Sequence, residues 1–429
     1  MLSEAVLDLV IDRLVDRIET GNEYILKKMG ESIKKIGTLT PTEAQQLAQT
    51  LKYGGDYEKI ANKLAEITNM NVKDIYKIFE EVAKADQNFA KQFYKYNKKK
   101  FIPYAVNKAL KSQVRAIAEM TANKIINISK TTVLGYGWVD EETGEITYKD
   151  LKNIYYDLID EAVLSVGQGK ESFDSAMYRQ LKTIGESGLK VIYPTTYIDK
   201  KGRERHYVRR LDTSVRMNMK DSLKEMHNKL QEQFGKEFGA DGWEVSVHGN
   251  PAPDHMYVQG KQFSKEEFDK FQNDEDSISY DGVKFPAESS ETGHDRRSIG
   301  QYNCYHKVFS IVLGVSQPEY TNKELEEIIA ENNKGFEFDG KHYTNYEGTQ
   351  LQRSIETAIR QAKDDQILGV SSNNEDMIRE SQERIRILTD KYDKLSKISG
   401  LPTKIERMQV AGYKPIKLND NIITIPKEK

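Results

Sequence analysis

The side chains with the most reactive chemistry gather in one part of the chain. The only cysteine, Cys304, lies in the stretch GQYNCYHKVF with His306 two residues later, and His248, His255 and His294 precede it. Thiolate and imidazole groups are the usual ligands of zinc, and four of them would complete a tetrahedral structural site. His248, His255, Cys304 and His306 therefore form a candidate metal or structural cluster.

Three other interpretations compete with a metal site. Histidines often hydrogen-bond the backbone of a loop-rich segment, and we favour this reading because no pair has a tight CxxC or HxxxH spacing. A Cys304 nucleophile with a histidine base is a second interpretation, but a cysteine between tyrosines is more typical of a small buried side chain. The third is a metal-dependent hydrolase or nuclease that uses Asp254 or Asp295 as its carboxylate. We expect no catalytic residue and no cofactor, unless the cluster holds a structural zinc.

A basic stretch with few acidic residues lies before this cluster. Its cations that could bind DNA or a partner are Lys200, Lys201, Arg203, Arg205, Arg209, Arg210, Arg216 and Lys220. Clustered arginines at a strand and a helix start are typical of a surface for phosphate groups or for an acidic partner. A solvated strand edge, whose charges block edge-to-edge pairing, fits the same pattern equally well.

The overall composition excludes several classes of protein. A net charge of −3 disfavours a globally basic nucleic-acid binder, and a single cysteine excludes an internal disulfide framework. The chain has no P-loop, GxGxxG or GxSxG motif, so nucleotide-driven chemistry is unsupported. It also has no signal peptide and no apolar run long enough to cross a bilayer, so we expect no membrane anchor.

Hydrophobic spacing and turn residues predict the elements that must position these side chains. Residues 1–135 have the spacing of helices, and Gly21 is a candidate stop for the first of them. The other predicted elements are a loop or short hairpin at 135–149, helices at 150–167, 172–187 and 212–235, two strands around KKGRE, a strand at WEVSVH, a hairpin turning at Asp339-Gly340, and helices at 345–368 and 375–399. Gly400 and Pro402 are expected to end the last helix.

These elements predict an α+β fold that is mostly α-helical. Elongated helical N- and C-terminal parts are expected around a small loop-rich α+β module. The predicted regions are 1–135, a helical N-terminal region; 136–188, a helical connector; 189–320, the α+β module; and 321–429, a helical C-terminal region with an extended tail.

Three blocks of sequence, in order, resemble the phage minor capsid protein 2 family, which is related to the Mu-F-type head morphogenesis proteins of tailed phages. The blocks are GLKVIYPTTYIDKKGRERHYVRRL, DGWEVSVHGNPAPDHMYVQGKQFS and IGQYNCYHKVFSIVLGVSQP. Gln259, Gly260, Lys261 and Asn303 belong to the matching motifs. The chain departs from the family pattern before His255, where Pro253 and Asp254 replace a small residue and an arginine.

The resemblance implies a structural minor capsid protein of a tailed phage or prophage, and not an enzyme. Such a protein would lie inside the head near the portal vertex, after assembly in the host cytoplasm. Its implied partners are the portal protein, the major capsid or scaffold protein, and double-stranded DNA. Its implied roles are head morphogenesis and the packaging or delivery of DNA, carried out by binding.

Overall fold

The structure is a computed structural model. It describes residues 4–36, 72–128, 134–139, 146–151, 173–199, 201–273 and 304–419, together with scattered positions within 59–67, 157–168 and 279–299 and with residues 422–424. In these parts the chain is mostly helical with small antiparallel sheets, which confirms the predicted α+β class. The expected helix at 150–167 lies largely outside the described residues.

The N-terminal region is helical, as predicted. Its long helices are α1 (Glu4–Ile36), α4 (Val72–Tyr96) and α5 (Lys108–Ile128). The expectation that Gly21 ends the first helix is wrong, because α1 continues through it to Ile36. A Cβ atom at Gly21 would lie 2.7 Å from Cδ2 of Leu64, so this glycine allows close packing within a continuous helix.

A four-stranded antiparallel sheet in the order β2-β1-β3-β4 follows these helices. Its strands are β1 (Leu134–Val139), β2 (Ile146–Asp150), β3 (Lys190–Ile198) and β4 (Glu204–Arg210). The predicted hairpins at 135–149 and around KKGRE are thereby confirmed. Helix α7 (Phe173–Ser187), also predicted, packs against β1.

The segment that holds the histidines and the cysteine forms a second, smaller sheet in the order β11-β5-β6. Its elements are β5 (Gly242–Val245), β6 (Gln262–Ser264), α9 (Lys265–Asn273) and β11 (Val308–Ile311), with the short strand pairs β7 (Ser279–Tyr280) with β8 (Val283–Lys284) and β9 (Glu288–Ser289) with β10 (His294–Asp295). The sheet has its own apolar cluster, to which Val245, Phe263 and Val308 contribute. The long helix α8 (Leu211–Phe238) contacts β11 and joins the two sheets.

The C-terminal region matches its predicted elements closely. It contains α10 (Asn322–Lys334), the hairpin β12 (Phe336–Phe338) with β13 (Lys341–Tyr343), α11 (Asn345–Ser372), α12 (Glu375–Ser399), a 3₁₀ turn (Ile405–Met408) and the strand pair β14 (Lys417–Asn419) with β15 (Ile422–Thr424). Asp339 and Gly340 both have positive φ, of 50° and 75°, as a two-residue type I′ turn requires. Gly400 ends α12 in the left-handed conformation.

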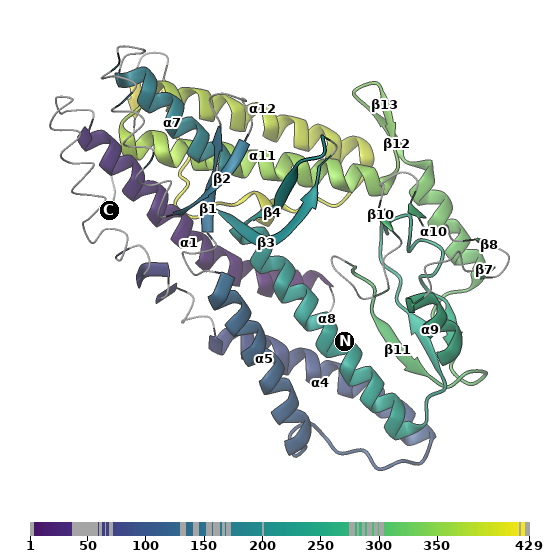
Figure 1. Ribbon diagram of the computed structural model, residues 1–429. Helices are drawn as coiled ribbons and strands as arrows, with labels where there is room; N and C mark the ends of the chain where they lie inside the picture. Colours follow the sequence, from purple (N-terminus) through teal and green to yellow (C-terminus); the bar gives the residue numbers. More distant parts are fainter. Residues whose placement is uncertain are drawn as a thin grey trace.

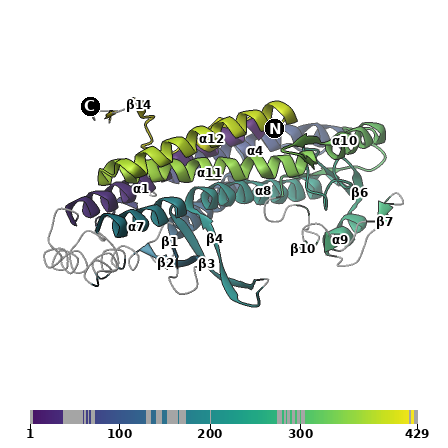
Figure 2. The same cartoon turned by 90° about the horizontal axis from the view of Figure 1, so that it is seen from above.

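One hydrophobic core joins parts of the chain that are distant in sequence. Ile11, Leu181, Phe234 and Leu368, one from each predicted region, belong to the same buried cluster, and the domain boundaries themselves stay predictions. Helix α1 packs against both α8 and α11 (Figure 1). Seen from above, α1, α8, α11 and α12 run along the long axis of the molecule, while the β3–β4 hairpin extends away from them (Figure 2). Within the described residues, no helix combines the length and the apolarity that crossing a membrane requires.

Candidate functional site

The small sheet brings the predicted His/Cys residues together. His255 lies in the turn between β5 and β6, and Cys304 and His306 lie just before β11. The Cys304 sulfur is 3.5 Å from Nδ1 of His255 and 3.5 Å from Nδ1 of His306. Cys304 is 7% exposed and each histidine 1%, so the three groups meet inside the protein. Their ligand atoms all lie within 4.8 Å of one another.

The motif Gln259-Gly260-Lys261 shapes the wall of this cluster. Gly260 has a φ of 72°, and a Cβ atom there would lie 2.4 Å from Cδ2 of Leu325, so the tight turn requires glycine. The N–H of Gly260 donates to the carbonyl of Val245, and the carbonyl of Lys261 accepts from the N–H of Val245. This clamp onto β5 turns the buried side chain of Gln259 toward His306, whose Nε2 is 3.3 Å from Oε1 of Gln259.

The remaining residues of the predicted cluster are at its edge or outside the described chain. The ring of His248 packs on that of His306 with 4.2 Å between centroids, and its Nδ1 is 3.0 Å from the carbonyl oxygen of Gly249. His248 is thus beside the three buried ligands but not among them. His294 lies in β10, but its side chain is outside the described part of the chain, and so is Asn303.

A cavity of about 340 Å³ lies next to the cluster, between the small sheet and the helices α1, α4 and α8. Cys304 and His248 line it on one side and Lys220 on the other. Lys224 Nζ donates to the backbone oxygen of Cys304 over 3.1 Å, which holds the segment before β11 against α8. Chemically, a thiol between two imidazoles suits the binding of a soft metal ion, because all three groups offer soft or borderline donor atoms.

The predicted basic surface divides into an outer and an inner part. The outer part is the β3–β4 hairpin, where Lys201 is exposed and Arg203 and Arg205 are half-buried. The Asp199 carboxylate accepts hydrogen bonds from both arginines over 3.0–3.3 Å, so it orders the turn and offsets part of its charge. Arg209 is half-buried and donates to the sulfur of Met217, and Lys200 lies outside the described residues.

The inner part of the stretch does not form a free surface. Arg216 pairs with Asp12 of α1, and Lys220 pairs with Asp8 of the same helix. Burial alone would raise the pKa of Asp8, but Lys220 and Lys404 outweigh it and lower the pKa to about 2. The structure therefore places these two cations at the contact between α8 and α1.

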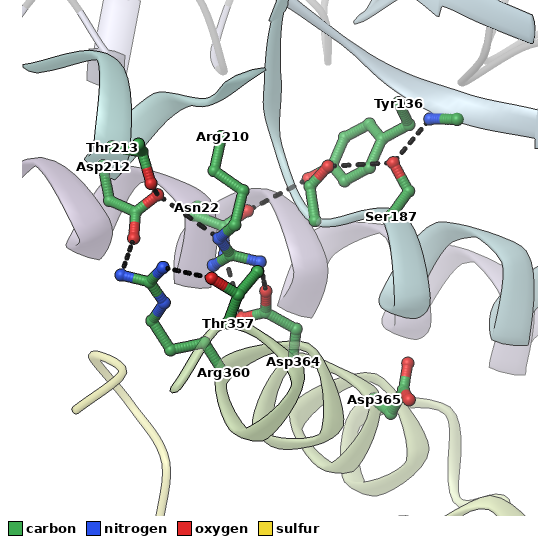
Figure 3. Close-up of polar contacts among 12 residues, drawn as sticks. Asn22, Tyr136, Ser187, Arg210, Asp212, Thr213, Thr357, Arg360, Asp364 and Asp365 are labelled. Carbon is green, nitrogen blue, oxygen red and sulfur yellow. Dashed lines mark hydrogen bonds and ion pairs between the residues drawn. The ribbon is translucent and has the colours of Figure 1, made fainter. Parts of the chain in front are cut away.

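Arg210 is also buried, at 6% exposure, in a network of charged side chains (Figure 3). Its guanidinium donates to Asp364 of α11 over 2.9 Å and to Asp212 of α8 over 3.3 Å. Arg360 pairs with the other oxygen of Asp212 at 2.7 Å, and Asn22 of α1 donates to Asp364 over 3.1 Å. Arg210 thus holds the sheet, α8 and α11 together, and in this position it cannot reach a phosphate group.

The electrostatics of this network follow from its burial and its excess of acids. Burial raises the pKa of Asp364, and burial together with the charge of Asp212 raises that of Glu19 well above its usual range. Burial opposes ionisation of Asp212 too, but Arg360 and Arg210 outweigh it and lower its pKa. Sequence reasoning missed the network, because no local pattern distinguishes its residues from surface charges.

Comparison with models of known protein families matches residues 2–395 to the family described as phage minor capsid protein 2. Neither the curated proteins nor the solved structures contain a significant match. The family match extends far beyond the three motif blocks and includes all the elements that build the His/Cys cluster and the Arg210 network.

Proposed function

Because the chain belongs to the phage minor capsid protein 2 family, we propose that this virion protein lies inside the phage head at the portal vertex and acts there by binding. The family match supports a structural role in the capsid, and the described residues add a surface suited to a partner. That surface is the β3–β4 hairpin, which extends from the helical body (Figure 2). We propose that it contacts the portal protein.

The side chains on this hairpin combine exposed apolar and cationic groups. Tyr197 and Tyr207 are 42% and 45% exposed, with ring centroids 4.8 Å apart, and Ile198 is 66% exposed. Tyrosine and arginine are enriched in protein interfaces, and tyrosine supplies a large contact area with little loss of conformational entropy. Arg203 and Arg205 lie on the same hairpin, so the surface suits an acidic patch on a partner that also offers apolar contacts.

Co-purification with the portal protein tests this proposal. We expect the full chain, co-expressed with the portal protein of its own phage, to form a complex that cross-links through Lys201. The double variant Tyr197→Ser with Tyr207→Ser should reduce binding, whereas Ile387→Ser, a change at an exposed apolar residue of α12, should not. Equal binding by both variants would refute the hairpin contact. No complex at all would refute the portal assignment.

DNA is the second implied partner, and the structure limits its contact to few charges. With Arg210, Arg216 and Lys220 turned inward, the described cations of the β3–β4 turn that reach the surface are Lys201, Arg203 and Arg205. If these three contact phosphates, the logarithm of the binding constant should fall with that of the salt concentration with a slope of about −3, from about 0.9 counterions released per phosphate contact. A slope near −7, as for eight contacts, would contradict the burial of the inner cations.

The hydrolase or nuclease alternative has less support from the geometry. His255 and His306 are each 1% exposed, whereas a general base must reach the substrate. We therefore propose a structural part for the His/Cys cluster. Nuclease assays with added Mg²⁺, Mn²⁺ or Zn²⁺ test this, and cleavage that is lost in Cys304→Ser would overturn it.

A further inference from the structure

We propose that Cys304, His255 and His306 bind a zinc ion through Sγ and the two Nδ1 atoms. In a tetrahedral site with Zn–S of about 2.3 Å and Zn–N of about 2.05 Å, sulfur and nitrogen ligands lie about 3.6 Å apart. The two sulfur–nitrogen distances here are both 3.5 Å. The two sulfur–nitrogen separations thus match those that the ion requires, and the three ligand atoms all lie within 4.8 Å of one another. The site is independent of the proposed portal contact.

The hydrogen bonds of Gln259 indicate the tautomer of His306, that is, which of its two ring nitrogens carries the hydrogen. The backbone N–H of His248 donates to Oε1 of Gln259 over 3.3 Å, so this atom is the amide oxygen and an acceptor. His306 Nε2, 3.3 Å from the same oxygen, must therefore carry the hydrogen. Nδ1 of neutral His306 then presents its lone pair toward Cys304, as a metal ligand does.

A carboxylate lies near the outer nitrogen of His255, at ion-pair and not hydrogen-bond distance. Nε2 of His255 is 3.7 Å from a carboxylate oxygen of Asp254, on the side of the ring away from the sulfur. A histidine that binds a metal usually directs its other nitrogen toward a carboxylate or carbonyl oxygen, which fixes the ring and increases its basicity. The thiol has one hydrogen, so it can donate a hydrogen bond to only one of the two imidazoles at a time. A zinc ion, in contrast, would bind the thiolate and both imidazoles together.

The position of the site explains what the ion would do. It would join the β5–β6 turn to the segment that enters β11, residues 49 positions apart in the chain. The apolar cluster of this small sheet is modest, and a metal that ties loop segments together contributes its binding free energy to folding. The fourth ligand would be water or the neighbouring His248, whose ring already packs on His306.

Metal analysis of the full-length protein, purified without chelators, tests the proposal. We expect about one zinc per chain in the wild type and less than about a tenth of that in Cys304→Ser and His306→Ala. The matched control is His342→Ala, because His342 is an exposed histidine on β13, and this variant should keep its zinc. Gln259→Leu should retain the fold and weaken zinc affinity by about 10- to 100-fold, as expected for loss of an outer partner.

Two measurements on the wild type keep the test decisive if the ligand variants fail to fold. Cobalt substitution should give the thiolate charge-transfer band and the strong visible bands of a tetrahedral site. Removal of the metal with a chelator should lower the melting temperature, and zinc should restore it. Metal-free protein that shows neither saturable zinc binding nor a thermal shift would overturn the proposal, as would zinc that persists in Cys304→Ser and His306→Ala.

Discussion

Replacing Arg210 with methionine should destabilise the protein strongly, because it leaves a buried carboxylate without its counter-ion. Asp364 has no exposed surface, and removing one partner of a buried ion pair typically costs about 3–5 kcal/mol. Asp364 would keep its hydrogen bond from Asn22, and Asp212 would keep Arg360, which places the loss near the lower end of this range. We therefore expect the free energy of unfolding to fall by about 3 kcal/mol at neutral pH.

Protonation of Asp364 sets an upper limit to this loss and makes it depend on pH. Carrying a proton at pH 7, about three units above the unfolded pKa of an aspartate, costs about 4 kcal/mol. In the variant the folded-state pKa of Asp364 is raised above its unfolded value, so the folded state takes up a proton that the unfolded state does not. The stability of Arg210→Met relative to wild type should therefore recover as the pH falls from 7 toward 5, by up to about 1.4 kcal/mol per unit.

Urea denaturation at several pH values, followed by circular dichroism, provides the assay. Arg203→Met is the matched control, because its ion pair with Asp199 is partly exposed to solvent and should contribute at most about 1 kcal/mol. Equal midpoints for Arg210→Met and wild type would refute the buried network. So would a variant of unchanged stability that binds DNA more weakly, since Arg210 would then act at the surface.

Three further changes test other parts of the structure by thermal or chemical unfolding. Asp8→Asn removes a carboxylate whose pKa Lys220 and Lys404 hold at about 2. Wild type should therefore be more stable than the variant above about pH 4, and this difference should disappear as the pH falls toward 2. A difference that stays constant across this range would contradict the pairing. Thr344→Ala removes a capping box at the start of α11 and should cost about 1 kcal/mol, whereas no loss would mean that the cap is unformed. Gly135→Ala places a Cβ atom 2.0 Å from a backbone oxygen of β2, so it should destabilise the protein far more than the cap variant.

Local sequence signals predicted the elements well where the residues that determine an element lie within it. The Asp339-Gly340 turn, the end of α12 at Gly400 and the hairpin around KKGRE depend on residues within a few positions of one another. Gly21 shows the limit of such signals, because its role is set by contact with Leu64. The sequence around a glycine does not distinguish a residue that ends a helix from one that allows another element to pack closely against the helix.

The His/Cys cluster was predictable as a set but not as a geometry. Rare residue types concentrated in one loop-rich segment indicated that they meet, and the structure brings three of the four together. The fourth, His248, could not be placed at the edge from sequence, because its position depends on the turn at Gly260 and on Gln259. No spacing rule links a turn between two strands of a sheet to the segment that precedes a third strand.

In the basic stretch, the spacing of the cations indicates their position in the fold better than their charge does. Arg216, Lys220 and Lys224 are four residues apart, so they share one face of a helix, and α8 directs that face inward. Asp8 and Asp12 have the same spacing on α1, and they pair with Lys220 and Arg216 respectively.

The same face of α8 continues toward the small sheet. His227 contacts both Asp86 of α4, at 2.8 Å, and the backbone oxygen of Val308 in β11, at 3.0 Å, and the hydroxyl of Ser310 donates to the Gln231 carbonyl. Buried polar contacts on α8 therefore connect the small sheet to the N-terminal helix α4. These contacts explain why so polar a helix lies at the centre of the fold.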